Sequence, residues 1–294
     1  MKISIVIPNW NGAEKLRRNL PAVLKVKKVD EIIISDDAST DNSLQVLNEE
    51  FPQVTVVKRS KNGGFSSNVN FGVSHATGDL IFLLNNDASP EYDSVEKALH
   101  HFENERVFSV GCNVGGNWVW AKWERGYFWH NQAKEKTEES HETLWASGGS
   151  GIFRKTVWDQ LGGLDELFNP FYEEDLDIGY RARKRGYINI MEPESHVEHY
   201  KEKGVISLNF SQSLVTKTAQ RNQLLFIWKN ITDQKMMNEH RMALIKMLVL
   251  HPKYWEIYLA ARKRWSELKK KRDVEISKEV ISDEEILSKF KDSI

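Results

Sequence analysis

The feature that most constrains the fold is a run of five apolar residues, from Leu80 to Leu84, that stops at Asn85, Asn86 and Asp87. A run this short and this uninterrupted is typical of a strand buried on both faces, as in a parallel sheet covered by helices. Ligands of such sheets bind at the carboxyl ends of the strands. A carboxylate with amide oxygens beside it can hold a divalent cation there. A polar turn explains the same three residues as simply, so this segment alone leaves both interpretations open.

Strand and helix patterns alternate along the first hundred residues. Apolar strands are expected at residues 3–7, 32–34, 54–57, 80–84 and 107–112. Helical spacing follows the first three strands, and Ser89 with Pro90 after the fourth is typical of an N-cap and first position of a helix. Repeated alternation of this kind predicts an α/β fold, a doubly wound parallel sheet with right-handed crossovers.

The alternation brings together polar residues that are far apart in sequence. Asn9, Asp36, Asp37, Asn85 and Asp87 all follow predicted strand ends, so we expect them along one edge of the sheet. An acidic residue after the second strand commonly accepts hydrogen bonds from a ribose or base. An N-cap and turn explain acidic residues there as well, although one aspartate is enough for a cap and two side by side favour binding.

A glycine loop precedes the third predicted helix. Residues 62–65, Asn-Gly-Gly-Phe, would let backbone amides approach a phosphate at the helix N-terminus. Neither G-x-G-x-x-G nor G-x-x-x-x-G-K-[ST] occurs in the chain, which argues against a dinucleotide dehydrogenase and a P-loop enzyme.

Composition bounds the remaining classes of protein. The 294 residues suffice for one large α/β domain or two ordinary ones, and a formal net charge of -1 gives no support for nucleic acid as a partner. A single cysteine, Cys112, excludes an intramolecular disulfide and suits a reducing compartment. We find no signal-peptide pattern and no run of 18 apolar residues, so a cytoplasmic location is expected.

Aromatic residues cluster after the fifth predicted strand. Trp118, Trp120, Trp123 and Trp129, with Gly126 between the last two, indicate a β-hairpin. Tryptophan faces can bind sugar rings, but a half-buried aromatic ribbon accounts equally well for the pattern. The polar residues 130–143 are expected to form a mobile loop or lid.

Glycines and acids follow the aromatic segment. Three glycines within residues 148–151 indicate a close backbone approach. Residues 155–161 predict a short helix, and a second helix is expected from about Glu173 to Arg185. Four acids near its start, at positions 173, 174, 175 and 177, complement the helix dipole, so a structural role explains them without any chemistry.

Taken together, the motifs resemble the family 2 glycosyltransferases of the GT-A fold, particularly the rhamnosyltransferase-like branch. The resemblance covers about residues 1–205, and six segments carry it in family order: residues 5–11, 35–41, 62–70, 83–87, 162–166 and 174–181. It implies a nucleotide-binding half at 1–105, an acceptor half at 106–205 and a helical extension at 206–294.

The resemblance also implies residue roles. Asp175, with Glu174 as the alternative, would be the general base, while Asp87 and His199 would hold Mn²⁺ or Mg²⁺ on the donor diphosphate. Asp36 or Asp37 would contact the nucleobase or ribose. The implied donor-nucleotide residues are Pro8, Asn9, Asn11, Asp36, Asp37, Asn62, Gly64, Asn68, Asn85 and Asn86. The acceptor residues would be Trp118, Trp120, Trp145, Gly149 and Arg181.

The implied activity is inverting transfer of a sugar from a UDP- or dTDP-linked donor to a hydroxyl acceptor in surface polysaccharide synthesis. The acceptor would be a glycan or lipid-linked glycan. One departure stands out: Asn85 occupies the first acidic position of the Asp-x-Asp motif, so one carboxylate remains there. A nucleotidyltransferase, or a glycan-binding module built on the tryptophans, is the competing interpretation.

The end of the chain predicts helices. Residues 221–230 resemble a stretch that follows the catalytic domain in the same branch. A helix from Pro252 would carry Trp255, Tyr258, Leu259 and Trp265 on one face with many basic residues. Such a helix either lies in a membrane interface, giving a peripheral contact with the inner face of the cytoplasmic membrane, or packs on the domain. Residues 273–294 are expected to be a loose helix or disordered.

Overall fold

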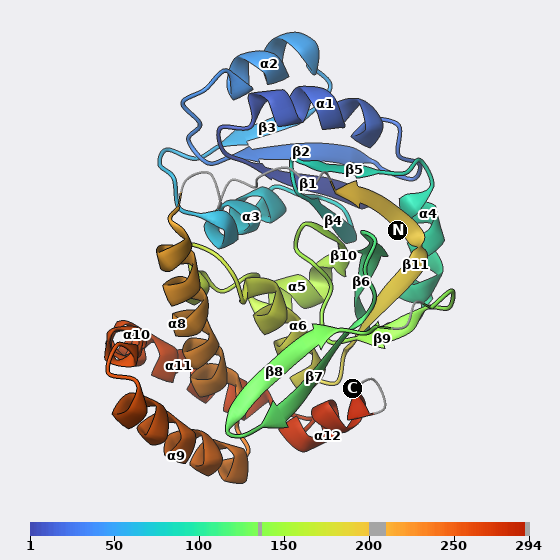
Figure 1. The fold of residues 1–294 in the computed structure, drawn as a ribbon. Helices are drawn as coiled ribbons and strands as arrows, with labels where there is room; N and C mark the ends of the chain where they lie inside the picture. The colour runs from blue at the N-terminus through green and yellow to red at the C-terminus, as the bar shows by residue number, and fades with distance from the viewer. Residues whose placement is uncertain (135–136, 200–209, 292–294) are drawn as a thin grey trace.

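The computed structural model describes residues 1–134, 137–199 and 210–291. A sheet of nine strands runs through its centre in the order β3-β2-β1-β4-β10-β6-β11-β5, with β9 also paired to β11 (Figure 1). These strands are β1 (Ile3–Asn9), β2 (Glu31–Asp36), β3 (Thr55–Lys58), β4 (Leu80–Leu84), β5 (Ala88–Pro90), β6 (Val107–Asn113), β9 (His141–Thr143), β10 (Ser150–Arg154) and β11 (Ile188–His199).

Helices cover both faces of the sheet. One face packs against α1 (Ala13–Val23), α2 (Ser43–Glu50), α4 (Ser94–Ala98) and the 3₁₀ turn η1 (Leu99–Glu103). The other packs against α3 (Phe65–Ser74), α5 (Lys155–Leu161) and α6 (Glu174–Lys184).

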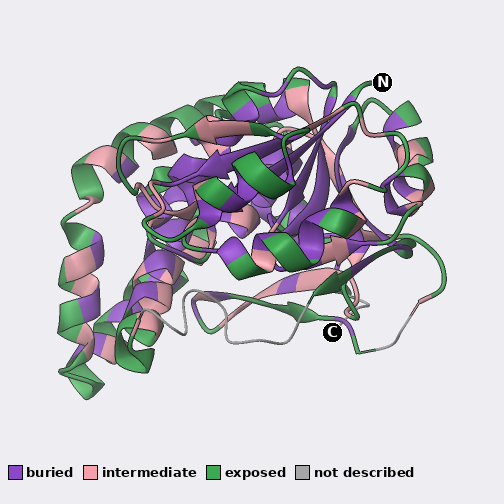
Figure 2. Ribbon diagram, turned by 90° about the horizontal axis from the view of Figure 1, so that it is seen from above, coloured by how far each residue is buried: buried purple, intermediate pink, exposed green. Residues whose placement is uncertain are grey.

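The central strand β4 shows why the two-sided cover forms. Leu80, Phe82 and Leu84 enter one core cluster, while Ile81 and Leu83 enter the other. All five side chains are buried, because successive residues of a strand point to opposite faces. Figure 2 shows the same burial along the strands of the central sheet. The apolar run therefore predicts this strand and its bounds correctly.

The expected α/β fold with a mostly parallel sheet flanked by helices is confirmed, and some strands pair antiparallel. β1, β2, β3 and β4 pair in parallel, whereas β10 runs antiparallel between β4 and β6. The loop before β10 lies at the carboxyl end of β4, where the Asn85 amide donates to the Gly149 carbonyl at 2.9 Å. The chain therefore enters β10 from that edge and must run back along the sheet.

The helix expected at Ser89 and Pro90 is wrong. These residues lie in β5, which pairs antiparallel with β11 in a register that sets Pro90 opposite Val197 and Ala88 opposite His199. Helix α4 begins only at Ser94. Pairing with a distant strand, which a local pattern cannot show, overrides the cap signal.

The aromatic segment forms the predicted hairpin, β7 (Val119–Glu124) with β8 (Tyr127–Gln132). Because β8 continues to Gln132 and β9 begins at His141, the connection between them is shorter than the loop or lid expected from sequence. Residues 135–136 of that connection lie outside the described residues.

The C-terminal region is helical, as predicted. It contains α8 (Gln212–Asn230), α9 (Gln234–Leu250), α10 (Tyr254–Arg262), α11 (Trp265–Lys278) and α12 (Asp283–Ser288). They share a core cluster with the hairpin, α6 and the short turn η2 (Glu166–Phe168). None of the helices in the described ranges is long and apolar enough to cross a bilayer.

The expectation of a loose or disordered tail is wrong for the described part of residues 273–294. Phe290 is buried, and Asp283 accepts hydrogen bonds from Tyr180 at 2.6 Å and Lys184 at 2.9 Å. A mixed-charge pattern indicates exposure, but here one charge is satisfied inside the fold. Residues 292–294 lie outside the described residues.

Candidate functional site

A cleft of about 580 Å³ opens at the carboxyl ends of β1 and β4, between the start of α3, the loop before β10 and the start of α6. It brings together most of the residues that the sequence singled out. Those that line it are Pro8, Asn9, Asp37, Asn62, Gly64, Asn68, Asn85, Asn86, Asp87, Gly149, Glu174, Asp175 and His199.

The polar strand ends are joined by a hydrogen-bond network. Asn9 donates to Asp36 at 3.0 Å and accepts from Asn86 at 2.8 Å. Asn68 donates to the Ser35 carbonyl at 2.8 Å. These buried contacts hold the ends of β1, β2 and β4 in a fixed relation, because buried polar groups must find partners.

The two neighbouring aspartates have different surroundings. Asp37 lines the cleft and accepts from the backbone amides of Gly63 and Gly64, both at 3.0 Å, so it shapes the glycine loop. Burial raises the pKa of Asp37, against the lowering effect of these amides. Asp36 is buried and does not line the cleft. Asn11 also lies outside the lining, where its side-chain oxygen accepts from the Thr40 amide at 2.7 Å.

Asp87 and His199 meet at one end of the cleft. His199 Nε2 lies 3.3 Å from Asp87 Oδ1 and 3.4 Å from Asn85 Nδ2. The register of β5 with β11 causes this meeting, since His199 stands opposite Ala88. A carboxylate, an imidazole and an amide that can turn its oxygen inward are a donor set that suits Mn²⁺ or Mg²⁺. Lys15, which the sequence did not indicate, also contacts Asp87 Oδ2 at 2.7 Å.

Two acids at the start of α6, Glu174 and Asp175, line the cleft, and neither pairs with a cationic side chain of the described residues. Asp175 Oδ2 accepts from the Gly148 amide at 3.1 Å. Burial raises the pKa of Asp175, and burial with the Asp175 charge raises the pKa of Glu174. Burial and the same charge raise the pKa of Glu173 to about 8. Perturbed acids in a cleft are candidates for proton transfer.

An aromatic wall completes the cleft, and the sequence reasoning missed it. Its members are Trp10, Phe65, Phe171, Tyr172 and Phe210. Phe171 packs edge-to-face with Tyr172 and with Phe210, with ring centroids 5.2 and 5.0 Å apart. The adjacent aromatic pair before the acidic run was an available signal.

Arg181 does not lie in the acceptor part of the cleft, and that prediction is corrected. The buried guanidinium donates to Asp177 at 2.7 Å and to the carbonyls of Leu161 and Gly163 at 2.6 and 2.8 Å. Helical spacing sets Arg181 four residues after Asp177, so the pair closes within α6. Its role is structural.

The tryptophans expected at the acceptor also lie outside the cleft lining, whereas Gly149 lies within it. Trp118 stacks on His141 with ring centroids 4.0 Å apart. Trp120 and Trp145 are half-buried and pack against the core beneath the hairpin. The alternative interpretation, a half-buried aromatic ribbon, describes them better.

A second group of potential metal ligands lies outside the cleft lining. His100, His101 and Glu192 place their ligand atoms within 4.8 Å of one another, and His101 contacts Glu192 at 2.6 Å. Among the described residues, it is the one group of three or more His, Cys, Asp or Glu side chains that lie close enough to share an ion. Its nitrogen-rich donor set differs from the oxygen-rich set at Asp87.

Residues 4–162 match the family model described as glycosyl transferase family 2. The chain belongs to this family. It is 34% identical over 184 residues to chondroitin synthase of Pasteurella multocida, covering 59% of this chain and only 18% of that protein. It is 22% identical over 239 residues to N-acetylglucosaminyl-diphospho-decaprenol L-rhamnosyltransferase of Mycobacterium tuberculosis, covering 68% of this chain and 76% of that protein.

Solved structures place this family 2 glycosyltransferase in the GT-A fold. GalNAc-T7 with UDP, GalNAc and Mn²⁺ aligns with a TM-score of 0.66 at 17% identity, over 80% of this chain and 48% of that one. S. aureus TarS 1-349 with UDP-GlcNAc aligns at 0.58 and 15% identity, over 89% and 79%. The resemblance inferred from sequence is thereby confirmed for family and fold.

Proposed function

We propose that this glycosyltransferase is an inverting, metal-dependent enzyme that moves a sugar from a UDP- or dTDP-linked donor to a hydroxyl of a glycan or lipid-linked glycan in surface polysaccharide synthesis. One observation carries the proposal: Asp87 and Asp175, 88 positions apart, line the same cleft. A peripheral contact with the inner face of the cytoplasmic membrane belongs to the same proposal.

The donor nucleotide would lie along the edge made by Pro8, Asn9, Asp37 and the glycine loop. Because the amides of Gly63 and Gly64 are held by Asp37, that carboxylate would act chiefly by fixing the loop. The base would pack against the aromatic wall. An open strand edge with a preformed loop is the usual position of a nucleotide in this type of sheet.

Asp87, His199 and Asn85 would hold the cation beside the diphosphate, and a bound cation stabilises the charge that develops on a departing diphosphate. Lys15 neutralises Asp87 in the structure described and would turn toward a phosphate oxygen when the donor binds. The Mn²⁺ in the structures of GalNAc-T7 and a Pyrobaculum calidifontis mannosyltransferase supports manganese as the first ion to test.

Asp175 would take the proton from the acceptor hydroxyl as it attacks the anomeric carbon from the side opposite the diphosphate. Its raised pKa suits a base that is needed only as the hydroxyl becomes acidic. The Gly148 amide orients the carboxylate at 3.1 Å. Holding donor and acceptor in line would supply much of the remaining rate enhancement.

Thermal unfolding with a panel of UDP-, dTDP- and GDP-sugars, with and without Mn²⁺, tests the donor and the metal together. We expect one nucleotide class to raise the unfolding temperature only when Mn²⁺ is present, and to be hydrolysed slowly. Asp87→Asn should remove the manganese-dependent part of the shift.

A matched control is Glu192→Gln, which alters the other group of potential ligands. It should leave the manganese-dependent shift at the cleft unchanged. A shift that is lost in Glu192→Gln but kept in Asp87→Asn would contradict the assignment of the metal.

A further inference from the structure

Helix α9 has apolar residues on two opposite sides, and the fold uses only one of them. His240, Leu244 and Leu248 point inward and are buried. On the other side Met242, Ile245 and Val249 are 69%, 57% and 73% exposed. This outer stripe continues on Leu250, Trp255 and Leu259, each about half exposed. Exposed apolar residues gathered on neighbouring helices indicate a binding site.

The segment that carries the outer stripe is basic. Residues 234–265 carry seven lysines and arginines against two glutamates, in a chain whose formal net charge is -1. The sequence expectation of one aromatic face is corrected here. Trp255 and Leu259 point outward, whereas Tyr258 and Trp265 pack against Trp228 with ring centroids 6.0 Å away.

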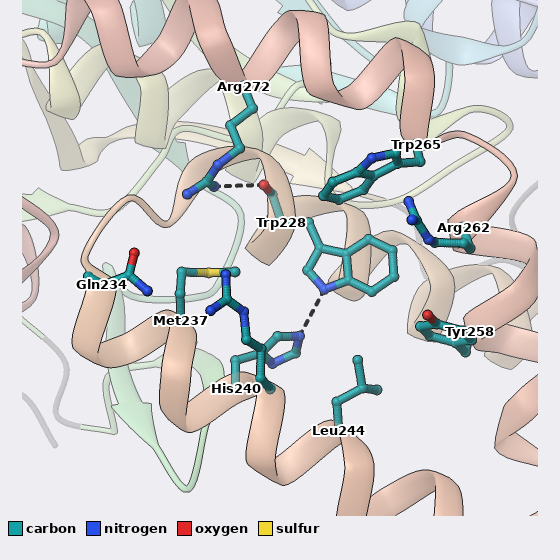
Figure 3. Close-up of a pocket in the computed structure, with 10 residues that line it drawn as sticks. Trp228, Gln234, Met237, His240, Leu244, Tyr258, Arg262, Trp265 and Arg272 are labelled. Atoms are coloured by element: carbon teal, nitrogen blue, oxygen red, sulfur yellow. Dashed lines mark hydrogen bonds between the residues drawn. The ribbon is translucent and has the colours of Figure 1, made fainter.

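A pocket of about 300 Å³ lies between α8, α9, α10 and α11 (Figure 3). The inward residues His240 and Leu244 line it on α9, and Tyr258 and Arg262 line it on α10. Three aromatic residues line this pocket: Trp228, Tyr258 and Trp265. Three arginines also line it: Arg241, Arg262 and Arg272. Among the described residues no carboxylate lines this pocket, so three positive charges line it without a negative one.

Each arginine is held in place by an uncharged partner. Arg272 donates to the carbonyls of Trp228 and Ile231, both at 2.7 Å, and Arg262 lies over the Trp265 ring at 4.5 Å. Arg241 donates to the side chain of Asn238 at 3.0 Å. In the described part of the chain none of the three pairs with a carboxylate, so guanidinium donors are left for an anion.

We propose that α9 and α10 dock this protein on an anionic lipid bilayer, with the outer stripe among the acyl chains and a headgroup phosphate at the arginine pocket. The two features adjoin on α10, where Tyr258 and Arg262 of the pocket each follow a stripe residue by three positions. The inference rests on the peripheral membrane contact of the proposed function and names its surface. An amphipathic helix with apolar residues on one side and basic residues around them binds such interfaces.

A second copy of the chain fits this surface poorly. A twofold contact through the stripe would set the same basic segment against itself, because an isologous interface pairs each patch with its own copy. Like charges then repel, whereas an anionic bilayer complements both the pocket and its surroundings.

Co-sedimentation of the full chain with vesicles tests the proposal. We expect binding about tenfold tighter to phosphatidylcholine mixed with phosphatidylglycerol than to phosphatidylcholine alone. Val249→Asp should reduce binding at least tenfold. Val280→Asp is the matched control, since both valines are 73% exposed and only Val249 lies on the stripe. Arg262→Gln should weaken binding to the anionic vesicles alone, and Arg17→Gln on α1 should not.

Three kinds of outcome would overturn the inference. One is equal binding by Val249→Asp and Val280→Asp, or no binding by the unaltered chain. Another is thermal stabilisation by glycerol phosphate that depends on Arg262 while vesicles do not bind, which would indicate a site for soluble anions. The third is a dimer in size-exclusion chromatography that Val249→Asp dissociates. Donor binding is measured on the same variants, so loss of vesicle binding with donor binding intact leaves the proposed transfer reaction untouched.

Discussion

Two aspartates near the start of α6, Asp175 and Asp177, have opposite surroundings although they are two residues apart. Asp177 is fully buried and accepts from Arg181 at 2.7 Å, from Lys229 at 2.7 Å and from Asn230 at 2.8 Å. Asp175 faces the cleft, and no cationic side chain of the described residues pairs with it. The Asp177 carboxylate is neutralised inside the fold, whereas the Asp175 carboxylate remains accessible to a ligand in the cleft.

The neutralised region extends to the C-terminal helices. Lys229 of α8 also contacts Asp165, and Lys271 of α11 reaches the same carboxylate at 2.8 Å. Although burial opposes it, the two lysine charges lower the pKa of Asp165. The contrast with the raised pKa of Asp175 teaches that charge compensation, rather than residue type or motif position, separates a structural acid from a candidate for catalysis.

The sharpest test of the comparison is Asp175→Asn. We expect sugar transfer to fall by about 10³-fold because the acceptor hydroxyl loses its base, while the stabilisation of the protein by the donor nucleotide persists. Single-turnover transfer and thermal unfolding measure the two effects. Asp177→Asn should instead lose activity only in proportion to the unfolded fraction. A normal transfer rate in Asp175→Asn would move the base elsewhere, with Glu174 the next residue to test.

The second test is removal of the buried lysine. Lys229→Met should lower the free energy of unfolding by about 3–5 kcal/mol, because it leaves two buried carboxylates short of positive charge. Denaturant unfolding measures the loss. Lys217→Met on the same helix is the control: its pair with Glu256 is exposed, with side chains 45% and 66% accessible, so the cost should stay below about 1 kcal/mol. Equal losses of unfolding free energy in Lys229→Met and Lys217→Met would show that the buried lysine contributes no more to stability than the exposed one.

The smallest effect concerns pH. Burial and the charge of Asp175 raise the pKa of Glu173 to about 8 from its usual 4.5. The folded state therefore holds a proton that the unfolded state releases, and the stability that this proton contributes is lost as pH rises through about 8. Glu173→Gln should match the unaltered protein near pH 4.5 and unfold a few degrees higher above pH 8. Unfolding temperatures that fall in parallel for the two proteins would show that Glu173 is ionised in the fold.

Local patterns predicted most of the sheet. β4 was predicted to the residue because an uninterrupted apolar run is typical of a buried strand. The strand-end polar residues other than Asp36 met in the cleft because parallel strands share an edge. Long-range pairing was beyond the sequence: Ser89 and Pro90 form a strand only because β11 lies beside them. Arg181 was misassigned for a similar reason, since its motif position could not reveal that Leu161 and Gly163 surround it.

Two features had weaker signals in the sequence: the aromatic wall of the cleft and the packing of the C-terminal segment against the fold. Phe171 and Tyr172 precede the acidic run, but an aromatic pair is more often core than cleft. In the sequence, Asp283 is one charged residue within a segment of mixed charge. Its partners Tyr180 and Lys184 are about 100 positions away and approach it only in the fold. Both features depend on where α8 and α12 pack, which no spacing rule determines.

The pairing of β5 with β11 determines which side chains lie beside Asp87. His199 reaches this carboxylate because strand register sets it opposite Ala88, with no contribution from the local sequence of either segment. Inserting one residue just before His199 would reverse the side on which its imidazole emerges while leaving every residue of the motif in place. If His199 holds the cation as proposed, relatives of this enzyme with altered spacing at that point would need a ligand from another part of the chain, even when their sequences retain the aspartate.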